Sequence, residues 1–382
     1  MPDLPATDSI AETIMRGCIQ KVATGPEYSK DLSFDEAHAA MRTILEGKAD
    51  PVQVAVLLIA LRMKRETDDE NAGVLQAIID SMTPVTAEVD ELLDIADPYD
   101  GYSRGLAISP FLAPVFAACG MPALSHGVER LGPKYGATHR KVLANAGIDV
   151  DRTAGEIAQD LANPDIGWGY VDQRAFCPAL HDLIPLRTRI VKRQVLTTVE
   201  VLTGPVRGRQ KTHLMTGYVH KAYPPIYANL ARQAGFDTAA IIRGVEGGVI
   251  PSLKQPARIF CYHERGEESP VECYPDSIGI DQPTRAVPIP ADTPSATRKD
   301  DQIATTVDID AAAATAAQTG LEALAGRPGP AHDSLVYAAA IVLHHLGRHD
   351  SLTDAAGTVR QVLASGAALA RFKAATRANR AA

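Results

Sequence analysis

The segment 94–105, DIADPYDGYSRG, places carboxylates and a glycine turn where α/β proteins often hold phosphates. It follows a short apolar run and precedes a helical pattern. At such a junction, free backbone amides and the helix dipole favour an anion. Close approach to a phosphate requires glycine, however, and the segment has Asp-Pro-Tyr-Asp at 97–100. Two interpretations stay open: a phosphate-binding loop, or an ordinary turn with Asp100-Gly101 at its corner.

A second segment is strongly basic. Residues 183–223 hold eight Lys or Arg and one acid, Glu200, which gives +7 in a chain of net charge -8. Clustered cations bind polyanions through weak, salt-sensitive phosphate contacts, but they are also common on solvated helix faces. The overall negative charge argues against a protein that coats nucleic acid with its whole surface. The candidate basic patch consists of Arg189, Lys192, Arg193, Arg207, Arg209 and Lys211.

Other site chemistries find little support. The five cysteines lack CxxC spacing, which argues against a zinc site and a disulfide framework. His344 and His345 lie in an apolar helical pattern and are interpreted as structural. There is no P-loop and no GxSxG motif. No apolar run approaches the ~18 residues of a membrane helix, and the first residues do not resemble a secretory signal. We therefore expect a cytoplasmic protein with no membrane contact.

The first ninety residues predict a helical domain. Ser33 to Glu36 and Thr67 to Glu70 fit capping boxes, in which a hydroxyl and a carboxylate satisfy each other's free backbone amides. Asp50-Pro51 fits a cap followed by proline at the first helical position. The next residues, VQVAVLLIALRMK, are apolar nearly all round, which indicates a buried helix.

Beyond about residue 89, short apolar runs alternate with helical patterns. This alternation is typical of a parallel sheet whose strands are connected by helices. We expect strands at 92–96, 121–127, 238–244 and 257–263, and helices at 109–120, 138–148, 226–234, 309–325, 333–347 and 351–372. Residues 264–306 contain six prolines and predict an irregular stretch. The fold class is therefore α/β, with a small N-terminal helical domain and a larger α/β domain with a mostly parallel central sheet flanked by helices.

The order of several motifs resembles the anthranilate phosphoribosyltransferase family over nearly the whole chain. The motifs are the helical start from SFDEAHAAM, then DIADPYDG, SHGVERLGPKYGA, LTGP, GVEGG and GPAHDSLVYAAAIVLHHLG. The resemblance implies a homodimer formed through the helical domain. It also implies domains at 1–90, completed by helices within about 178–203, and at 91–177 with 204–382.

The resemblance assigns site residues one by one. The family's pyrophosphate loop, GTGGDG, matches residues 96–101, where only Asp100 and Gly101 are kept. One phosphate-binding hydroxyl remains at Ser109. The family's KHGN segment becomes Ser-His-Gly-Val, which keeps His126 and Gly127 but loses the lysine and the asparagine.

The remaining assignments concern cations and a metal. Lys134 and Gly136 resemble the lysine and glycine of the family's second phosphate loop. Arg187 resembles the arginine that grips the anthranilate carboxylate. The family binds magnesium through an Asp-Glu pair, of which Glu246 alone is present, so it is either a Mg²⁺ ligand or an exposed acid in a glycine turn.

Two functions follow from these features. The first is a diverged phosphoribosyltransferase with an altered active site that binds a phosphorylated ligand and transfers a pentosyl group to an unidentified acceptor. The second is a non-catalytic protein that binds nucleic acid through a basic cleft at 187–221, as a divergent branch of the group does. Tryptophan biosynthesis is not assigned, because too many substrate-binding positions have changed.

Overall fold

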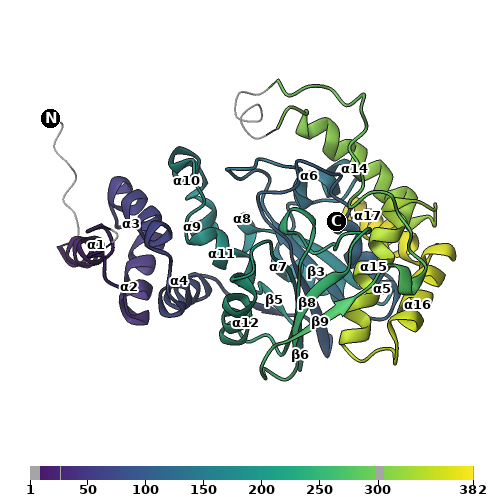
Figure 1. The fold of residues 1–382 in the computed structure, drawn as a ribbon, viewed down its shortest axis with the longest axis horizontal. Coiled ribbons are helices and arrows are strands. Elements are labelled where there is room, and N and C mark those ends of the chain that lie inside the picture. Colours follow the sequence, from purple (N-terminus) through teal and green to yellow (C-terminus); the bar gives the residue numbers. More distant parts are fainter. Residues whose placement is uncertain (1–8, 26, 298–304, 382) are drawn as a thin grey trace.

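A computed structural model describes residues 9–25, 27–297 and 305–381. It has a helical domain at one end and a larger α/β domain at the other (Figure 1). Two short helices from the middle of the chain also lie against the helical domain, with α10 in contact with α3 and α11 in contact with α4. The helices of residues 9–80 and 173–199 are α1 (Ser9–Val22), α2 (Phe34–Leu45), α3 (Pro51–Lys64), α4 (Asp68–Asp80), α8 (Gln173–Phe176), α9 (Pro178–His181), α10 (Ile184–Ile190) and α11 (Leu196–Val199).

The predicted helix starts are confirmed. Ser33 and Thr67 each accept a hydrogen bond from the amide three residues on, and the glutamates at those positions, Glu36 and Glu70, bond back to the cap amides. Asp50 caps α3 through the amides of its second and third residues. Local sequence therefore fixes where α2, α3 and α4 begin.

The central sheet has seven strands in the order β4-β3-β2-β6-β7-β8-β9. The first five in this order are parallel, whereas β8 pairs antiparallel with β7 and β9 pairs antiparallel with β8. A separate parallel pair joins β1 (Val85–Thr86) to β5 (Val206–Arg207). The strands of the central sheet are β2 (Glu91–Ala96), β3 (Ala123–Gly127), β4 (Trp168–Asp172), β6 (Lys211–Gly217), β7 (Thr238–Ile242), β8 (Ala257–Tyr262) and β9 (Ser269–Cys273).

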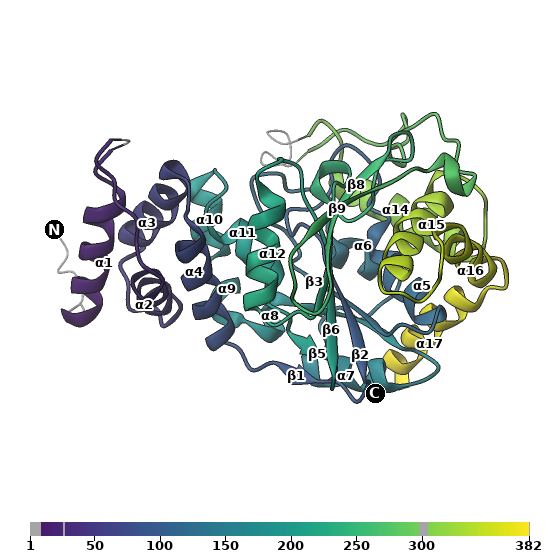
Figure 2. The ribbon, with the colours of Figure 1, turned by 60° about the horizontal axis from the view of Figure 1, so that its bottom comes forward.

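Both faces of the sheet are buried. Leu93 of β2 packs into one apolar core and its neighbour Leu92 into the other, as the two-residue period of a strand requires. The first core is covered mainly by the C-terminal helices, while the second faces the helical domain (Figure 2). The flanking helices are α5 (Leu112–Ala118), α6 (His139–Asn145), α7 (Ala154–Ala162), α12 (Tyr223–Gln233), α14 (Ile309–Leu324), α15 (Pro330–His345), α16 (Leu352–Ala364) and α17 (Ala367–Ala381).

The order of the strands defines where a ligand would bind. After β2 the chain first forms β3 and β4 on one side of it. It then returns to form β6 and the later strands on the other side of β2. Ligands of open α/β sheets bind at such a switch point, beyond the carboxyl ends of the strands. The loop that follows Ala96 lies at this point.

One expectation about the fold is wrong in part. The stretch 264–306 was expected to be irregular, yet it contains β9 and a short 3-10 helix, η4 (Asp276–Ile278). β9 is the edge strand, where Pro270 is tolerated because a ladder hydrogen bond can be missing there. A segment with a proline and exposed side chains gives little strand signal. Residues 298–304 of the stretch lie outside the described residues.

A group of histidines lies at the opposite end of the sheet from this loop. His213 is near the start of β6, and the rings of His263 and His345 are 4.2 Å apart. Burial lowers the pKa of both His213 and His345 from 6.5 to about 4. The unfolded chain therefore binds protons below pH 6.5 that the folded chain does not. Their contribution to stability is complete above pH 6.5 and is lost as the pH falls toward 4.

We predict that His213→Gln flattens the dependence of the unfolding free energy on pH between 6.5 and 4. Each unit of pKa shift corresponds to about 1.4 kcal/mol. Urea unfolding at a series of pH values measures this slope. His220→Gln, which removes an exposed histidine, serves as the control and should leave the slope unchanged. A His213→Gln protein with the wild-type slope would contradict the assignment.

Candidate ligand cleft at the carboxyl end of the sheet

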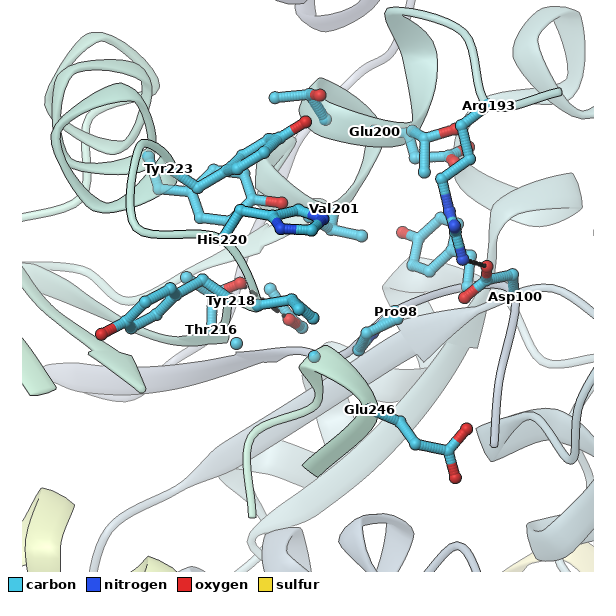
Figure 3. Close-up of a pocket in the computed structure, with 18 of the residues that line it drawn as sticks. Pro98, Asp100, Arg193, Glu200, Val201, Thr216, Tyr218, His220, Tyr223 and Glu246 are labelled. Atoms are coloured by element: carbon cyan, nitrogen blue, oxygen red, sulfur yellow. Dashed lines mark hydrogen bonds and ion pairs between the residues drawn. The ribbon is translucent and has the colours of Figure 1, made fainter. Parts of the chain in front are cut away.

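A cavity of about 260 Å³ lies between the helical domain and the carboxyl ends of β2 and β6 (Figure 3). Arg62 of α3 lines it on the helical side, and Thr216 and Gly217 of β6 line it on the sheet side. Tyrosines form much of the remaining wall. They are Tyr99, Tyr218, Tyr223 and Tyr227. The wall therefore combines four tyrosines with five charged side chains, which are Arg62, Asp100, Arg193, Glu200 and Glu246.

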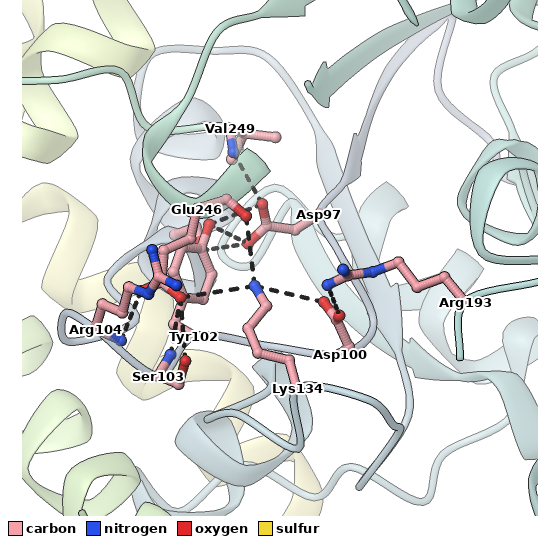
Figure 4. A network of polar contacts seen from close by, with 10 residues as sticks. Asp97, Asp100, Tyr102, Ser103, Arg104, Lys134, Arg193, Glu246 and Val249 are labelled. Atoms are coloured by element: carbon pink, nitrogen blue, oxygen red, sulfur yellow. Dashed lines mark hydrogen bonds and ion pairs between the residues drawn. The ribbon is translucent and has the colours of Figure 1, made fainter. Parts of the chain in front are cut away.

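The carboxylate of Asp97 is the centre of the polar contacts behind the loop (Figure 4). The Asp97 side chain is buried and accepts hydrogen bonds from four different groups. The donors are the Tyr102 hydroxyl at 2.8 Å, the Ser109 hydroxyl at 2.5 Å, His139 Nε2 at 2.8 Å and the Val249 amide at 2.9 Å. Burial alone would raise the pKa of Asp97, but the hydrogen bonds and the charge of His139 together hold it below its usual value.

These contacts determine what Ser109 can do. The resemblance assigns its hydroxyl to a phosphate, but in the structure this hydroxyl points at Asp97 Oδ2. The amide of Val249 points at the other oxygen of the same carboxylate. A carboxylate of the protein thus occupies donors that would suit an external anion.

Glu246 plays a similar part on the outer side of the loop. Its carboxylate accepts the backbone amides of Ser103 at 3.0 Å and Arg104 at 2.8 Å. Glu246 has a left-handed φ of 55°, which is costly for a non-glycine residue. Gly248 allows the close approach, since a Cβ there would lie 1.7 Å from the Tyr102 hydroxyl oxygen. The GVEGG turn is therefore packed tightly against the loop.

Asp100 faces two cations at the mouth of the cavity. Its carboxylate is 2.5 Å from Arg193 Nη2 and 3.5 Å from Lys134 Nζ. Gly101 and Gly136 bring the two loops together, because Tyr102 and Ala137 pair as a β-bridge beside them. A Cβ on either glycine would meet backbone atoms at 2.6 Å or less. Glycine is thus required at both positions by packing.

His126 lies in the core rather than at the cavity surface. Its Nδ1 is 2.6 Å from the Tyr99 hydroxyl and its Nε2 is 2.8 Å from Asp94. Gly127 follows it at the end of β3, against the rings of Tyr99 and Tyr170. Burial and nearby acids raise the pKa of Tyr99 well above its usual value, so Tyr99 is a neutral phenol. His126 thus holds Tyr99 in the cavity wall.

Arg187 was expected to grip a ligand carboxylate, but the structure places it in an internal ion pair. Its guanidinium forms two hydrogen bonds of 2.7 Å with the carboxylate of Glu200. Both side chains are almost fully buried. Glu200, the single acid of the basic segment, neutralises Arg187. Glu200 lines the cavity, and Arg187 does not.

The basic patch does not form one groove, so the expectation of a basic cleft at 187–221 is wrong. Arg189, Lys192 and Arg193 are exposed on α10 and the residues after it. The other three cations lie near the amino end of β6, about 20 Å from its cavity end by the rise of a strand. There, Arg207 packs on the Phe236 ring, Arg209 pairs with Glu88 and Asp90, and Lys211 begins β6. The cations at 189–193 and those at 207–211 therefore lie at opposite ends of β6, which is part of the same segment. The number of charges in the sequence does not reveal this separation.

Two residues of the cleft, Arg62 and His139, were not among the site residues expected from the sequence. Arg62 donates hydrogen bonds to the Tyr223 hydroxyl, to Gln194 and to Thr198, and so joins α3 to the segments across the cavity. The signal that could have identified it is weak, because Arg62 lies in the last turn of α3 beside Lys64, where cations are common. His139, the first residue of α6, gave no comparable signal in the sequence.

The fold and the cleft together define a two-domain α/β protein with a helical domain and a ligand cavity at the strand switch point. The model of the glycosyl transferase family, helical bundle domain, matches residues 16–82. An anthranilate phosphoribosyltransferase of Rhodopseudomonas palustris (strain BisA53) is 28% identical over 94% of this chain and 96% of its own length. An uncharacterized protein of Aquifex aeolicus (strain VF5) is 28% identical over 71% of this chain and 80% of its own length.

Solved structures show the same fold. The anthranilate phosphoribosyltransferase of Thermus thermophilus has a TM-score of 0.71 at 23% identity, covering 95% of this chain and 98% of its own. The Saccharomyces cerevisiae enzyme in complex with PRPP and Mg has a TM-score of 0.74 at 17% identity, covering 96% and 99%. These findings support an anthranilate phosphoribosyltransferase-like family member, as the motifs predicted. In the part of the chain that the structure describes, no helix is long and apolar enough to cross a membrane.

We predict that Asp97→Ala lowers the unfolding free energy by about 3–5 kcal/mol, because four buried donors lose their acceptor. Inorganic phosphate should then stabilise the variant, by up to about 2.7 kcal/mol at a hundredfold excess over Kd. Thermal unfolding with and without phosphate measures both effects. Asp97→Asn, which leaves no room for the anion, is the matched control and should not respond. A wild-type protein that responds to phosphate as strongly as Asp97→Ala would contradict this account of Asp97.

Proposed function

We propose that the protein is a phosphoribosyltransferase-like protein with an altered active site, whose cleft binds a phosphorylated ligand. One observation carries the proposal: Asp97 and Glu246 occupy hydroxyl and amide donors of the loop that follows β2, and Asp97 also occupies the Val249 amide of the turn after β7. An incoming pyrophosphate would have to displace both carboxylates. Phosphoribosyl pyrophosphate held in this loop is therefore disfavoured by repulsion and by the loss of internal hydrogen bonds.

The phosphate of the ligand has a different place available. Arg193 and Lys134 both approach Asp100 at the edge of the cavity. The side chain of Arg193 is 51% exposed, so a phosphate can compete with Asp100 for it without unfolding the loop. Guanidinium groups bind phosphate through charge-assisted hydrogen bonds. We assign the phosphate of the ligand to Arg193 and Lys134.

The reaction we propose is transfer of a pentosyl group to an acceptor bound in the aromatic cavity. The relative from Rhodopseudomonas palustris is named for phosphoribosyl transfer, and the yeast enzyme binds PRPP and Mg. Such reactions need groups that stabilise developing charge more than they need a side-chain nucleophile. In this chain Arg193 and Lys134 are suited to hold the 5-phosphate of the pentosyl donor. The bond from C1 to the donor's leaving group then breaks, the leaving group departs with the electron pair, and a bond from C1 to the acceptor forms beside the tyrosines of the cavity.

Magnesium does not fit the described residues in the arrangement expected from the family. The two oxygens of Glu246 already accept the amides of Ser103 and Arg104. In the part of the chain that the structure describes, no group of three His, Cys, Asp or Glu side chains could hold a metal ion. Each oxygen keeps a second lone pair, but the ammonium group of Lys134 lies 3.7 Å from Oε2. We therefore assign no role to Glu246 as a metal ligand while Lys134 is in place.

Nucleic-acid binding, the alternative drawn from the basic segment, loses its main support. A non-specific binder needs a row of cations that tracks the nucleic-acid backbone. The cations between Arg187 and Lys211 are divided among a buried ion pair, the cavity edge and the far end of β6. Retention of single-stranded DNA that falls steeply with salt would restore this alternative.

We also propose a homodimer formed through the helical domain. An apolar groove of about 380 Å³ lies between α3 and α10, and Val52 within it is 69% exposed. A second copy of the same groove would cover these side chains. We predict that Val52→Glu converts the dimer to a monomer in sedimentation analysis while the far-UV circular dichroism stays unchanged. A wild-type monomer would contradict the proposal.

For the ligand itself, we predict that Arg193→Ala weakens binding of ribose 5-phosphate by about tenfold or more, the value of one charge-assisted hydrogen bond. Isothermal titration calorimetry measures the affinity. Lys192→Ala removes the neighbouring exposed cation, which does not line the cavity, and should bind as the wild type does. No heat with the wild type, or equal affinities for the wild type and Arg193→Ala, would contradict the proposed phosphate site.

A further inference from the structure

The ammonium group of Lys134 lies among three oxygens of the cleft. Its Nζ is 3.5 Å from Asp100 Oδ1, 3.7 Å from Glu246 Oε2 and 3.4 Å from the Glu246 carbonyl oxygen (Figure 4). The side chain is 14% exposed. Two carboxylates and a carbonyl are the ligand types that Mg²⁺ and Ca²⁺ take in proteins. In this chain a lysine fills the position that such ligands would give to a divalent cation.

The backbone holds Lys134 in this position. The amide of Gly136 donates to the Asp100 carbonyl at 2.8 Å, and the amide of Tyr135 donates to Leu131 at 3.0 Å. The ammonium group also lies 5.6 Å from the centre of the Tyr102 ring, an attractive arrangement for a cation. The segment 131–136 is therefore docked on the loop that carries Asp100, and Lys134 is directed between its two acids.

The charges at this place balance without a metal. Lys134 and Arg193 supply two positive charges, and Asp100 and Glu246 supply two negative charges. A divalent cation at the same place would leave a surplus of positive charge beside Lys134. Mg²⁺ also requires oxygens at about 2.0–2.1 Å in octahedral geometry, which cannot form while the ammonium group lies between the acids.

We propose that Lys134 takes the place of a divalent cation in this cleft, so that the protein binds its phosphorylated ligand without a metal. The second half of this statement rests on the proposed function, whereas the first half does not. Lys134 bridges the acids in the free protein and presents its charge to the phosphate when the ligand binds. A monovalent ammonium group thereby does the electrostatic work of a metal ion at a fixed position.

Binding of Mn²⁺, followed by electron paramagnetic resonance, tests the first half with no ligand present. We expect the wild type to take up no Mn²⁺ in the cleft. Lys134→Ala should bind Mn²⁺ at least about tenfold more tightly than the wild type, with Mg²⁺ as a competitor, because the vacated position is then lined by oxygens. Lys134→Arg keeps the charge and should resemble the wild type, as should Lys221→Ala, which removes an exposed lysine elsewhere.

A double variant locates the gained site. Lys134→Ala combined with Glu246→Gln should lose the Mn²⁺ binding that Lys134→Ala gains. Thermal unfolding of each variant verifies that it is folded. The proposal is overturned if the wild type binds Mn²⁺ and Glu246→Gln abolishes that binding. It is also overturned if folded Lys134→Ala gains no Mn²⁺ affinity.

Calorimetry with ribose 5-phosphate tests the second half. We expect the wild-type affinity to agree within about twofold in Mg²⁺ and in EDTA, and Lys134→Ala to bind more weakly in EDTA with partial recovery in Mg²⁺. Wild-type binding that needs Mg²⁺ would overturn metal independence. If ribose 5-phosphate gives no heat in either buffer while the Mn²⁺ results hold, the proposed function fails and the role of Lys134 stands.

Discussion

The buried carboxylate of Asp97 is the constraint on which the rest of the cleft depends. It collects donors from the loop after β2, from the start of α6 and from the turn after β7, so three segments distant in sequence share one acceptor. A buried charge is tolerated only when it is paired and hydrogen-bonded, and here all four donors serve that purpose. A site that could hold an external anion is thereby closed by an anion of the protein.

Much of the fold follows from local signals in the sequence. Caps at Ser33, Asp50 and Thr67 begin three helices, because a side chain satisfies amides that the helix leaves free. Alternating apolar runs and helical patterns predict the parallel strands β2, β3 and β7, but not β4 or β6. The loop at 97–105 was located at the correct end of β2. The edge strand β9 could not be found in this way, since its pairing with β8 is made by the fold and not by its own composition.

The contents of the cleft were less predictable, for a physical reason. Sequence shows that Asp97, Asp100 and Glu246 are acids, but not that they turn inward onto donors of the same loop and onto Lys134. Likewise, Arg187 and Glu200 are thirteen residues apart, and only the fold brings them into an ion pair. Charge counted along the chain does not tell which cations remain free, because pairing is decided by tertiary structure.

We propose that carboxylates of the protein occupy donors of the loop after β2 that would otherwise hold an anion. A crystal structure of the protein grown with phosphoribosyl pyrophosphate and Mg²⁺ tests it most directly. We expect that Asp97 stays bonded to Ser109 and Val249, that Glu246 stays on the amides of Ser103 and Arg104, and that any phosphate lies beside Arg193. A pyrophosphate group on Ser109 and the loop amides, with a metal ion on Glu246, would contradict it.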